Sequence, residues 1–206
     1  MSSKNFMDLK NNKIKLIKAE GGNNNMSTRL YKAISVRGNH EIGNLNTIWA
    51  KHIVNGAKLV CEDKDEIDNF TLVELGEYDE EGNLTCKPLS DHKKKGYLLT
   101  TVEEEQLMEG ETYVDFFNTK DEMVRLTRLE TGVRFETSAI ELNAGVKEAK
   151  QGMVAHFDAT KKKYIISNPL SAHASYAESV NKFNVVSVNT DFGFAFDKQT
   201  VRLECQ

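Results

Sequence analysis

The sequence predicts a mainly β protein, an antiparallel sandwich or barrel with one or two short helices and an extended N-terminal arm. Three observations predict it. Short runs in which apolar and polar residues alternate recur along most of the chain, and turn residues separate them. Helix signals are confined to two short capping-box segments. The 206 residues suffice for one sizeable domain or two small ones.

Composition narrows the class of protein. Hydrophobic residues make up 39% and charged residues 28% of the chain, which is typical of a soluble globular protein. The net charge is −4, so we expect no nucleic-acid partner, because such binders present a basic surface to phosphates. No apolar run approaches the about 20 residues that span a bilayer, and we expect no membrane partner. We expect reduced cysteines, because Cys61, Cys86 and Cys205 are widely spaced.

Residues 1–27 are predicted to form a flexible basic arm. Residues 1–25 contain five lysines against Asp8 and Glu20, a net charge of +3, so the rest of the chain carries −7. The arm ends in a polar Gly-Gly-Asn-Asn-Asn cluster. Two interpretations stay open: a disordered leader, or an arm that becomes ordered on an acidic neighbour. Residues 13–18 alternate well enough to add to another sheet as an edge strand.

Residues 28–95 are predicted to form an N-terminal β region. Residues 28–36 alternate, and residues 47–60 contain two apolar stretches separated at Asn55-Gly56, a strong hairpin signal. Residues 70–78 and 84–89 form a further pair across the acidic turn 79–83. The polar residues 91–95 then mark the boundary with a C-terminal β domain, residues 96–206.

The C-terminal domain is organised around residues 110–142. A strand over 96–99 and a short helix over 101–108, begun by a Thr101–Glu104 capping box, precede them. Residues 110–142 alternate in three runs, with breaks at 118–121 and at Gly132, and we interpret them as a three-stranded antiparallel meander. A hairpin follows over 152–167, then a helical turn begun by a Ser175–Glu178 capping box, and final strands within 182–188 and 193–203.

The candidate chemistry is weak. Residues 37–41, Arg-Gly-Asn-His-Glu, resemble a metal-binding block of calcineurin-like phosphoesterases, but the other ligand blocks of that class are missing and we interpret the string as a turn. His156 and Asp158 alternate onto one face of a strand, where His173 would be a third metal ligand. Runs of acidic residues at 79–81 and 103–105 are interpreted as solvated surfaces. We therefore expect no enzyme and no cofactor.

Residues 113–139 resemble a pattern in tailed-phage virion proteins, in which an aromatic-Asn turn leads to R-x-x-R-L-x-x-G-x-x-F-x-T. The matching residues are Arg125, Arg128, Leu129, Gly132, Phe135 and Thr137. The 152–167 hairpin and the strand at 183–188 follow in the same order. The resemblance covers about residues 96–188 and is to capsid decoration, or auxiliary head, proteins.

This resemblance implies a non-enzymatic bacteriophage structural protein. It would be made in the host cytoplasm and bind the major capsid protein on the exterior of the virion, either singly or as a homo-oligomer. Such proteins act through contact surfaces, so the hypothesis assigns contact residues and no catalytic ones. From charge and position they are Lys10, Lys13, Lys15, Lys18, Arg125 and Arg128.

Two other classes stay open. A carbohydrate-binding or fibre-like β module would show aromatic side chains gathered on one sheet face, and Tyr31, Trp49, Tyr97 and Tyr113 are scattered along the chain. A hydrolase with a cryptic metal site would use His40, His156 or His173.

Overall fold

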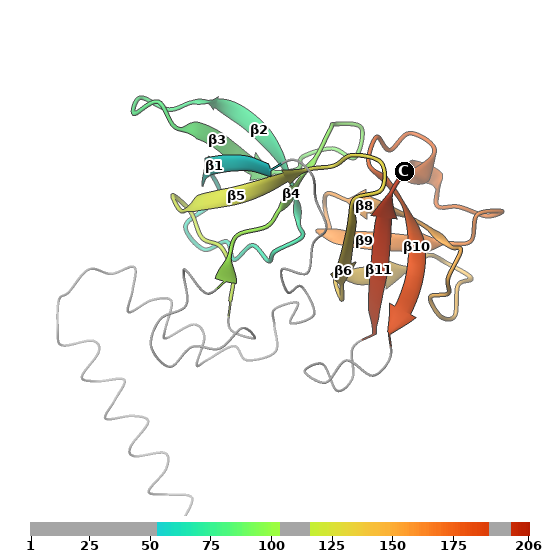
Figure 1. Cartoon of the computed structure of the whole chain (residues 1–206). Helices are drawn as coiled ribbons and strands as arrows, with labels where there is room; N and C mark the ends of the chain where they lie inside the picture. The colour runs from blue at the N-terminus through green and yellow to red at the C-terminus, as the bar shows by residue number, and fades with distance from the viewer. Residues whose placement is uncertain (1–52, 104–115, 190–198) are drawn as a thin grey trace, which may run out of the picture.

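The computed structural model describes residues 53–103, 116–189 and 199–206. These residues form eleven strands in two sheets, a closed five-stranded barrel and a six-stranded sheet. Figure 1 shows the barrel on the left and the sheet on the right. The predicted mainly β class is confirmed. The expected arm, the strand at 28–36 and the helix over 104–108 lie outside the described residues.

The barrel closes in the order β1-β3-β2-β4-β5. Its strands are β1 (Ile53–Leu59), β2 (Leu72–Tyr78), β3 (Leu84–Pro88), β4 (Tyr97–Leu99) and β5 (Met123–Arg128). β1 and β3 run parallel, and each other neighbouring pair is antiparallel. The fold therefore brings β1 beside both β3 and β5, which lie far from it in the sequence.

The six-stranded sheet has the order β6-β11-β10-β8-β9-β7. Its strands are β6 (Arg134–Thr137), β7 (Ile140–Leu142), β8 (Val154–Asp158), β9 (Lys163–Ser167), β10 (Lys182–Asn189) and β11 (Thr200–Cys205). β7 and β9 are parallel, and the other pairs are antiparallel. A short 3-10 helix, η3 (Ala174–Tyr176), lies in the connection from β9 to β10.

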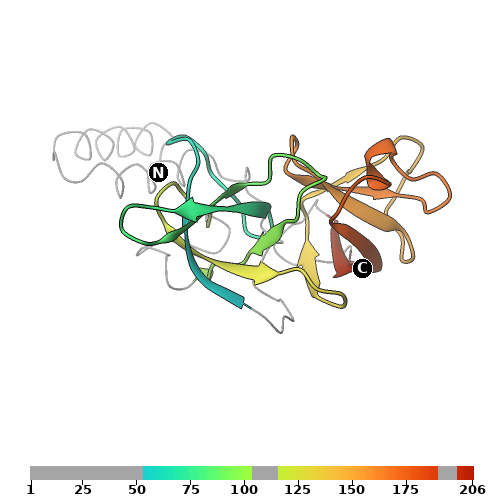
Figure 2. The same ribbon diagram turned by 90° about the horizontal axis from the view of Figure 1, so that it is seen from above.

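Two hydrophobic clusters hold the molecule together, and β2 and β4 contribute to both. Val73 and Leu99 face the barrel interior, whereas their neighbours Leu72 and Leu98 belong to the cluster that includes the buried side chains of the six-stranded sheet. Strand segments buried on both faces have no polar alternation, which explains the adjacent apolar pairs Leu72-Val73 and Leu98-Leu99. The barrel and the sheet lie side by side in Figure 2.

Several expected elements are confirmed. β2 and β3 form the hairpin across the acidic turn 79–83, and β8 and β9 form the hairpin within 152–167. The strands expected at 96–99 and 182–188 are β4 and β10. A helical turn forms near the one expected from Ser175, as the 3-10 helix η3, but the Ser175–Glu178 capping box is not what begins it. Its N-cap is His173, whose side chain accepts a hydrogen bond from the Ser175 N–H.

Two expectations were wrong. Asn55-Gly56 does not turn a hairpin: β1 runs through it, with an irregular register between Val54 and Ala57 where Gly56 has φ +70°. A glycine with positive φ fits a bulge as well as a turn. The meander within 110–142 is also wrong, since β5 pairs with β1 and β4 in the barrel whereas β6 pairs with β11 in the sheet.

The predicted boundary between residues 95 and 96 falls between β3 and β4, two strands of the same barrel. Asn181, in the connection to β10, bridges this point: its side chain accepts from Gly96 N–H at 2.9 Å and donates to Lys94 O at 2.8 Å. The division of the chain into domains stays a prediction.

Candidate functional site

The two arginines predicted as contact residues both lie on β5. The Nε of Arg125 donates to Thr100 O at 2.9 Å, whereas Arg128 is exposed, with its Nε 3.6 Å from a carboxylate oxygen of Glu130. Three positions apart on a strand, they fall on opposite faces. Arg128 stands opposite Tyr97 of β4. The fold thus does not gather them on one surface, and their contact role stays a prediction, as does that of Lys10, Lys13, Lys15 and Lys18, which lie outside the described residues.

The histidine candidates come together only in part. His156 is buried on β8, and its ring stacks on that of His173 with centroids 5.2 Å apart and planes at 25°. Asp158, in contrast, turns to the β8–β9 loop and accepts from the backbone N–H groups of Thr160 and Lys161. Within the described residues no group of three or more His, Cys, Asp or Glu side chains is arranged to hold a metal. His40 lies outside them.

Burial and the neighbouring His173 lower the pKa of His156 to about 4. The ring is therefore neutral at neutral pH. Its Nδ1 is buried without a hydrogen-bond partner in the described part of the structure. The pair is a polar cluster with an unmet hydrogen-bonding group.

A surface that the sequence did not reveal is centred on Lys58 of β1. Ala57 and Leu59 face the barrel core, so Lys58 between them faces outward. Its Nζ lies 3.4 Å from Asp79, 3.9 Å from Glu81 and 4.0 Å from Asp121. The hydrogen bond that Lys58 donates to Asp79 and the charge of Glu81 raise the pKa of Lys58. Lys58 thereby links the β2–β3 turn to the turn before β5.

Three exposed apolar residues lie in or beside the strands that carry Lys58 and its acidic partners. Val60, Tyr78 and Met123 are 45%, 71% and 50% exposed, and they are three of the five exposed large hydrophobic residues in the described part of the chain. Met123 pairs directly with Lys58 across β1 and β5. Val60 lies two residues beyond Lys58, and Tyr78 precedes Asp79. We call these four residues, with the acidic turns 79–83 and 119–122, the Lys58 surface.

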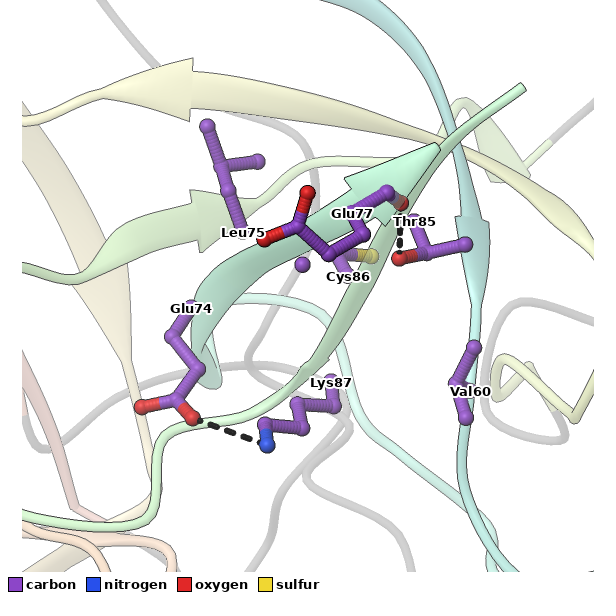
Figure 3. A pocket seen from close by; sticks show the side chains of 8 residues that line it. Val60, Glu74, Leu75, Glu77, Thr85, Cys86 and Lys87 are labelled. Atoms are coloured by element: carbon purple, nitrogen blue, oxygen red, sulfur yellow. Dashed lines mark hydrogen bonds and ion pairs between the residues drawn. The ribbon is translucent and has the colours of Figure 1, made fainter. Parts of the chain in front are cut away.

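A groove of about 450 Å³ adjoins this surface (Figure 3). Its lining residues come from the end of β1 and from β2 and β3: Val60, Glu74, Leu75, Gly76, Glu77, Thr85, Cys86 and Lys87. Leu75 and Cys86 also belong to the barrel core. The register of β2 against β3 shifts between Leu75 and Tyr78, and the Thr85 hydroxyl donates to Glu77 O at 2.5 Å within this irregularity.

The buried carboxylate of the groove, Glu74, is already neutralised. Lys87 and Lys94 approach it at 3.3 and 3.0 Å, and the Ser90 hydroxyl donates to it at 3.1 Å. Burial alone would raise the pKa of Glu74, but the hydrogen bonds from Lys94, Lys87 and Ser90 outweigh it and lower the pKa. Glu74 is therefore a paired anion, and the groove offers shape and apolar area more than a free acid or base.

No sequence signal marked these residues. Lys58 lies in a mostly apolar strand, and its three carboxylates lie in separate runs of charged residues that are typical of solvated turns. The exposed Val60, Tyr78 and Met123 stand in alternating patterns that predict strands but not exposure. Their proximity depends on the parallel pairing of β1 with β3 and on the closure of the barrel through β5.

Taken together, these features define a mainly β protein with a partly apolar exposed surface on a closed barrel. Residues 36–206 match the YonC prophage protein family, and the chain belongs to that family. It is 47% identical over 180 residues to the SPbeta prophage-derived uncharacterized protein YonC of Bacillus subtilis (strain 168). This alignment covers 87% of the present chain and 98% of the relative. No solved structure matches the chain.

The family confirms the predicted phage association. The family match begins at residue 36, so the basic residues Lys10 to Lys18 lie outside it. Within the described residues there is no helix whose length and apolar character would let it cross a bilayer.

Proposed function

We propose that this chain is a non-enzymatic structural protein of a phage particle. It decorates the exterior of the capsid and stabilises it by binding the major capsid protein. The observation that carries this proposal is the Lys58 surface, which combines exposed apolar side chains with charges that are paired within the protein. Membership of a prophage family supports the phage setting.

The chemistry of the Lys58 surface suits burial against another protein. Interface cores are enriched in Tyr and Met and depleted of unpaired charge, and Tyr78 and Met123 are the large exposed residues here. Lys58 already has three carboxylate neighbours. A charge that is paired before association does not become an uncompensated buried charge when a partner covers it.

The basic arm adds a second contact. Lys13 and Lys15 alternate with Ile14 and Leu16, which would give an extended segment a charged and an apolar face over these residues. Such a segment complements an acidic surface with exposed apolar side chains. The turns 79–83 and 119–122 of a neighbouring copy are a surface of this kind, so the arm also provides a route to a homo-oligomer on the shell.

Co-sedimentation with empty capsid shells of the phage that encodes the protein tests this function. The double variant Tyr78→Ser/Met123→Ser should bind more weakly by on the order of tenfold or more, since apolar anchors dominate interface energy. Leu170→Ser is the matched control, because Leu170 is 97% exposed on the six-stranded-sheet side. Equal binding of all three proteins, with unchanged melting temperatures, would remove the Lys58 surface from the interface.

The carbohydrate-binding alternative has less support. This alternative depends on the aromatic residues Tyr31, Trp49, Tyr97 and Tyr113, of which the structure describes Tyr97. Tyr97 packs against the barrel core instead of forming an open platform. Retention of the protein on a glycan array, with no binding to capsid shells, would favour this alternative.

A further inference from the structure

Three histidines from distant parts of the chain meet beside the six-stranded sheet. His156 lies on β8, His173 caps η3, and His92 lies in the loop between β3 and β4, close enough to influence the titration of His156. Tyr176 places its ring edge-on to His156 at 6.1 Å. Lys182 of β10 is directly opposite His156 in the sheet, and its Nζ lies 5.2 Å from the Tyr176 ring.

The hydrogen bonds of this cluster suit neutral imidazoles. The Nδ1 of His173 accepts from Ser175 N–H at 3.2 Å, so that nitrogen carries no proton. The Nδ1 of His156 and the Nε2 of His92 are buried without partners in the described residues. A proton on His173 Nδ1 would remove the acceptor that caps η3. A proton on His156 would place a charge in a site 1% exposed to solvent.

The charges around His156 mostly oppose its protonation. Burial and His173 lower its pKa to about 4, and His92 acts in the same direction. Lys182 stands opposite His156 across the strand pair, and its Nζ donates to Ala177 O at 3.0 Å. Asp158 raises the pKa of His156, but its carboxylate accepts hydrogen bonds from the backbone of the β8–β9 loop. The carboxylate of Asp91 lies 3.3 Å from the Nδ1 of His92 and so pairs with that histidine.

The sign of the effect follows from this lowered pKa. An unfolded or released His156 binds its proton near the ordinary value of about 6.5, well above the folded value. The folded arrangement around His156 therefore has its full stability above about pH 6.5. It loses stability as the pH falls from about 6.5 toward 4.

The segment that carries His173 also joins two parts of the molecule. Residues 171–181 contact the loop 91–95 through Val180 N–H to His92 O at 3.0 Å and through the Asn181 side chain to Lys94 O. The same segment reaches the end of β11, where Gln206 Nε2 donates to the Tyr176 hydroxyl at 3.0 Å. Loss of the histidine stack would loosen both contacts.

We propose that the His156–His173 pair is an acid-sensitive latch, which holds residues 171–181 against the sheet and against the loop 91–95. Protonation of the pair releases this segment while the barrel stays folded. Two positively charged imidazole rings with centroids 5.2 Å apart repel strongly in a partly buried site. The barrel core, formed by a separate hydrophobic cluster, contains none of the three histidines.

Hydrogen exchange of the full chain, measured at pH 7.5 and at 4.5 and corrected for intrinsic rates, tests the latch. Exchange in residues 171–181 and 91–95 should rise by about tenfold or more at the lower pH, whereas β1 and β5 keep their protection. An equal rise in the barrel, or none in residues 171–181, would overturn the proposal.

Two variants separate a latch from general acid unfolding. His173→Asn keeps an acceptor for the Ser175 N–H but cannot be charged, so release should require a lower pH than in the wild type. Asp63→Asn, an exposed change on the barrel, should leave the release pH unaltered. If His173→Asn releases at the wild-type pH, the pair is not the sensor. NMR titration of wild-type His156 gives an independent check, since a midpoint at the ordinary histidine value would also refute the latch.

Discussion

At the scale of single residues, Tyr164 joins the two parts of the molecule. Tyr164 is fully buried, and its ring centroid lies 5.1 to 5.4 Å from those of Phe135, Phe157 and Phe183. Its hydroxyl donates to Phe70 O at 2.7 Å. Phe70 itself has φ +65°, a conformation that a bulky residue adopts only when its surroundings hold it. Tyr164 therefore fixes a strained residue just before β2 of the barrel.

Tyr164→Phe should lower the free energy of unfolding by about 1–3 kcal/mol, because it leaves the buried Phe70 carbonyl without its donor while keeping the ring. Urea denaturation measures the change. Tyr176→Phe is the control, since its hydroxyl bonds to the exposed Gln206. A loss no larger in Tyr164→Phe than in the control would show that the hydroxyl does not hold Phe70.

Glu74 makes the stability of the folded protein depend on pH. Its pKa is lowered in the folded protein by the hydrogen bonds from Lys94, Lys87 and Ser90, which outweigh burial. The stabilisation is therefore fully present above the ordinary glutamate value of about 4.3 and is lost as the pH falls through the lower folded pKa. Glu74→Gln should be less stable at pH 7, and the difference from the wild type should shrink on acidification below pH 4. A constant difference across that range would contradict the charged pairing.

At the scale of elements, the irregularity in β2 depends on Gly76. A Cβ at this position would overlap the Thr85 hydroxyl, which is hydrogen-bonded to Glu77 O. Gly76→Ala should destabilise the protein by about 1–3 kcal/mol, the usual effect of overpacking. Thr85→Ala should restore part of this loss in the double variant, because it removes the clashing atom. Additive losses in the double-mutant cycle would show that the two residues do not meet.

The elements also show what alternation can and cannot predict. Alternating residues located β2, β3, β4, β8, β9 and β10 because each strand buries one face or both against a core. They did not predict partners: Leu129 to Val133 carries the chain from the barrel to the sheet, although short turns usually join neighbouring strands. Asn55-Gly56 misled for a similar reason, since the positive φ of Gly56 serves a bulge within β1.

The candidate site was less predictable than the strands. The proximity of His156 and His173 was predictable in part, because both are candidate ligands of one metal site in the sequence. The Lys58 surface was not, because it depends on contacts between Lys58, Asp79 and Asp121 that only barrel closure creates. Long-range pairing of this kind leaves no local pattern in a single sequence.

At the scale of the whole molecule, the proposal combines an acidic body with a basic arm. Removal of residues 1–25 should leave the melting temperature within about 2 °C of the full chain, because the arm is proposed to act on a partner. The same truncation should weaken binding to capsid shells and reduce any self-association, as measured by light scattering. Full shell binding by the truncated chain would assign the whole contact to the body.

We propose that this protein is a component of the capsid exterior. Quantitative mass spectrometry of purified particles, produced by a phage that encodes the protein, tests this assignment. The proposal predicts a fixed ratio of this chain to the major capsid protein, with its peptides lost first when intact particles are treated with protease. Absence from purified particles, with the protein present in the infected cell, would contradict it.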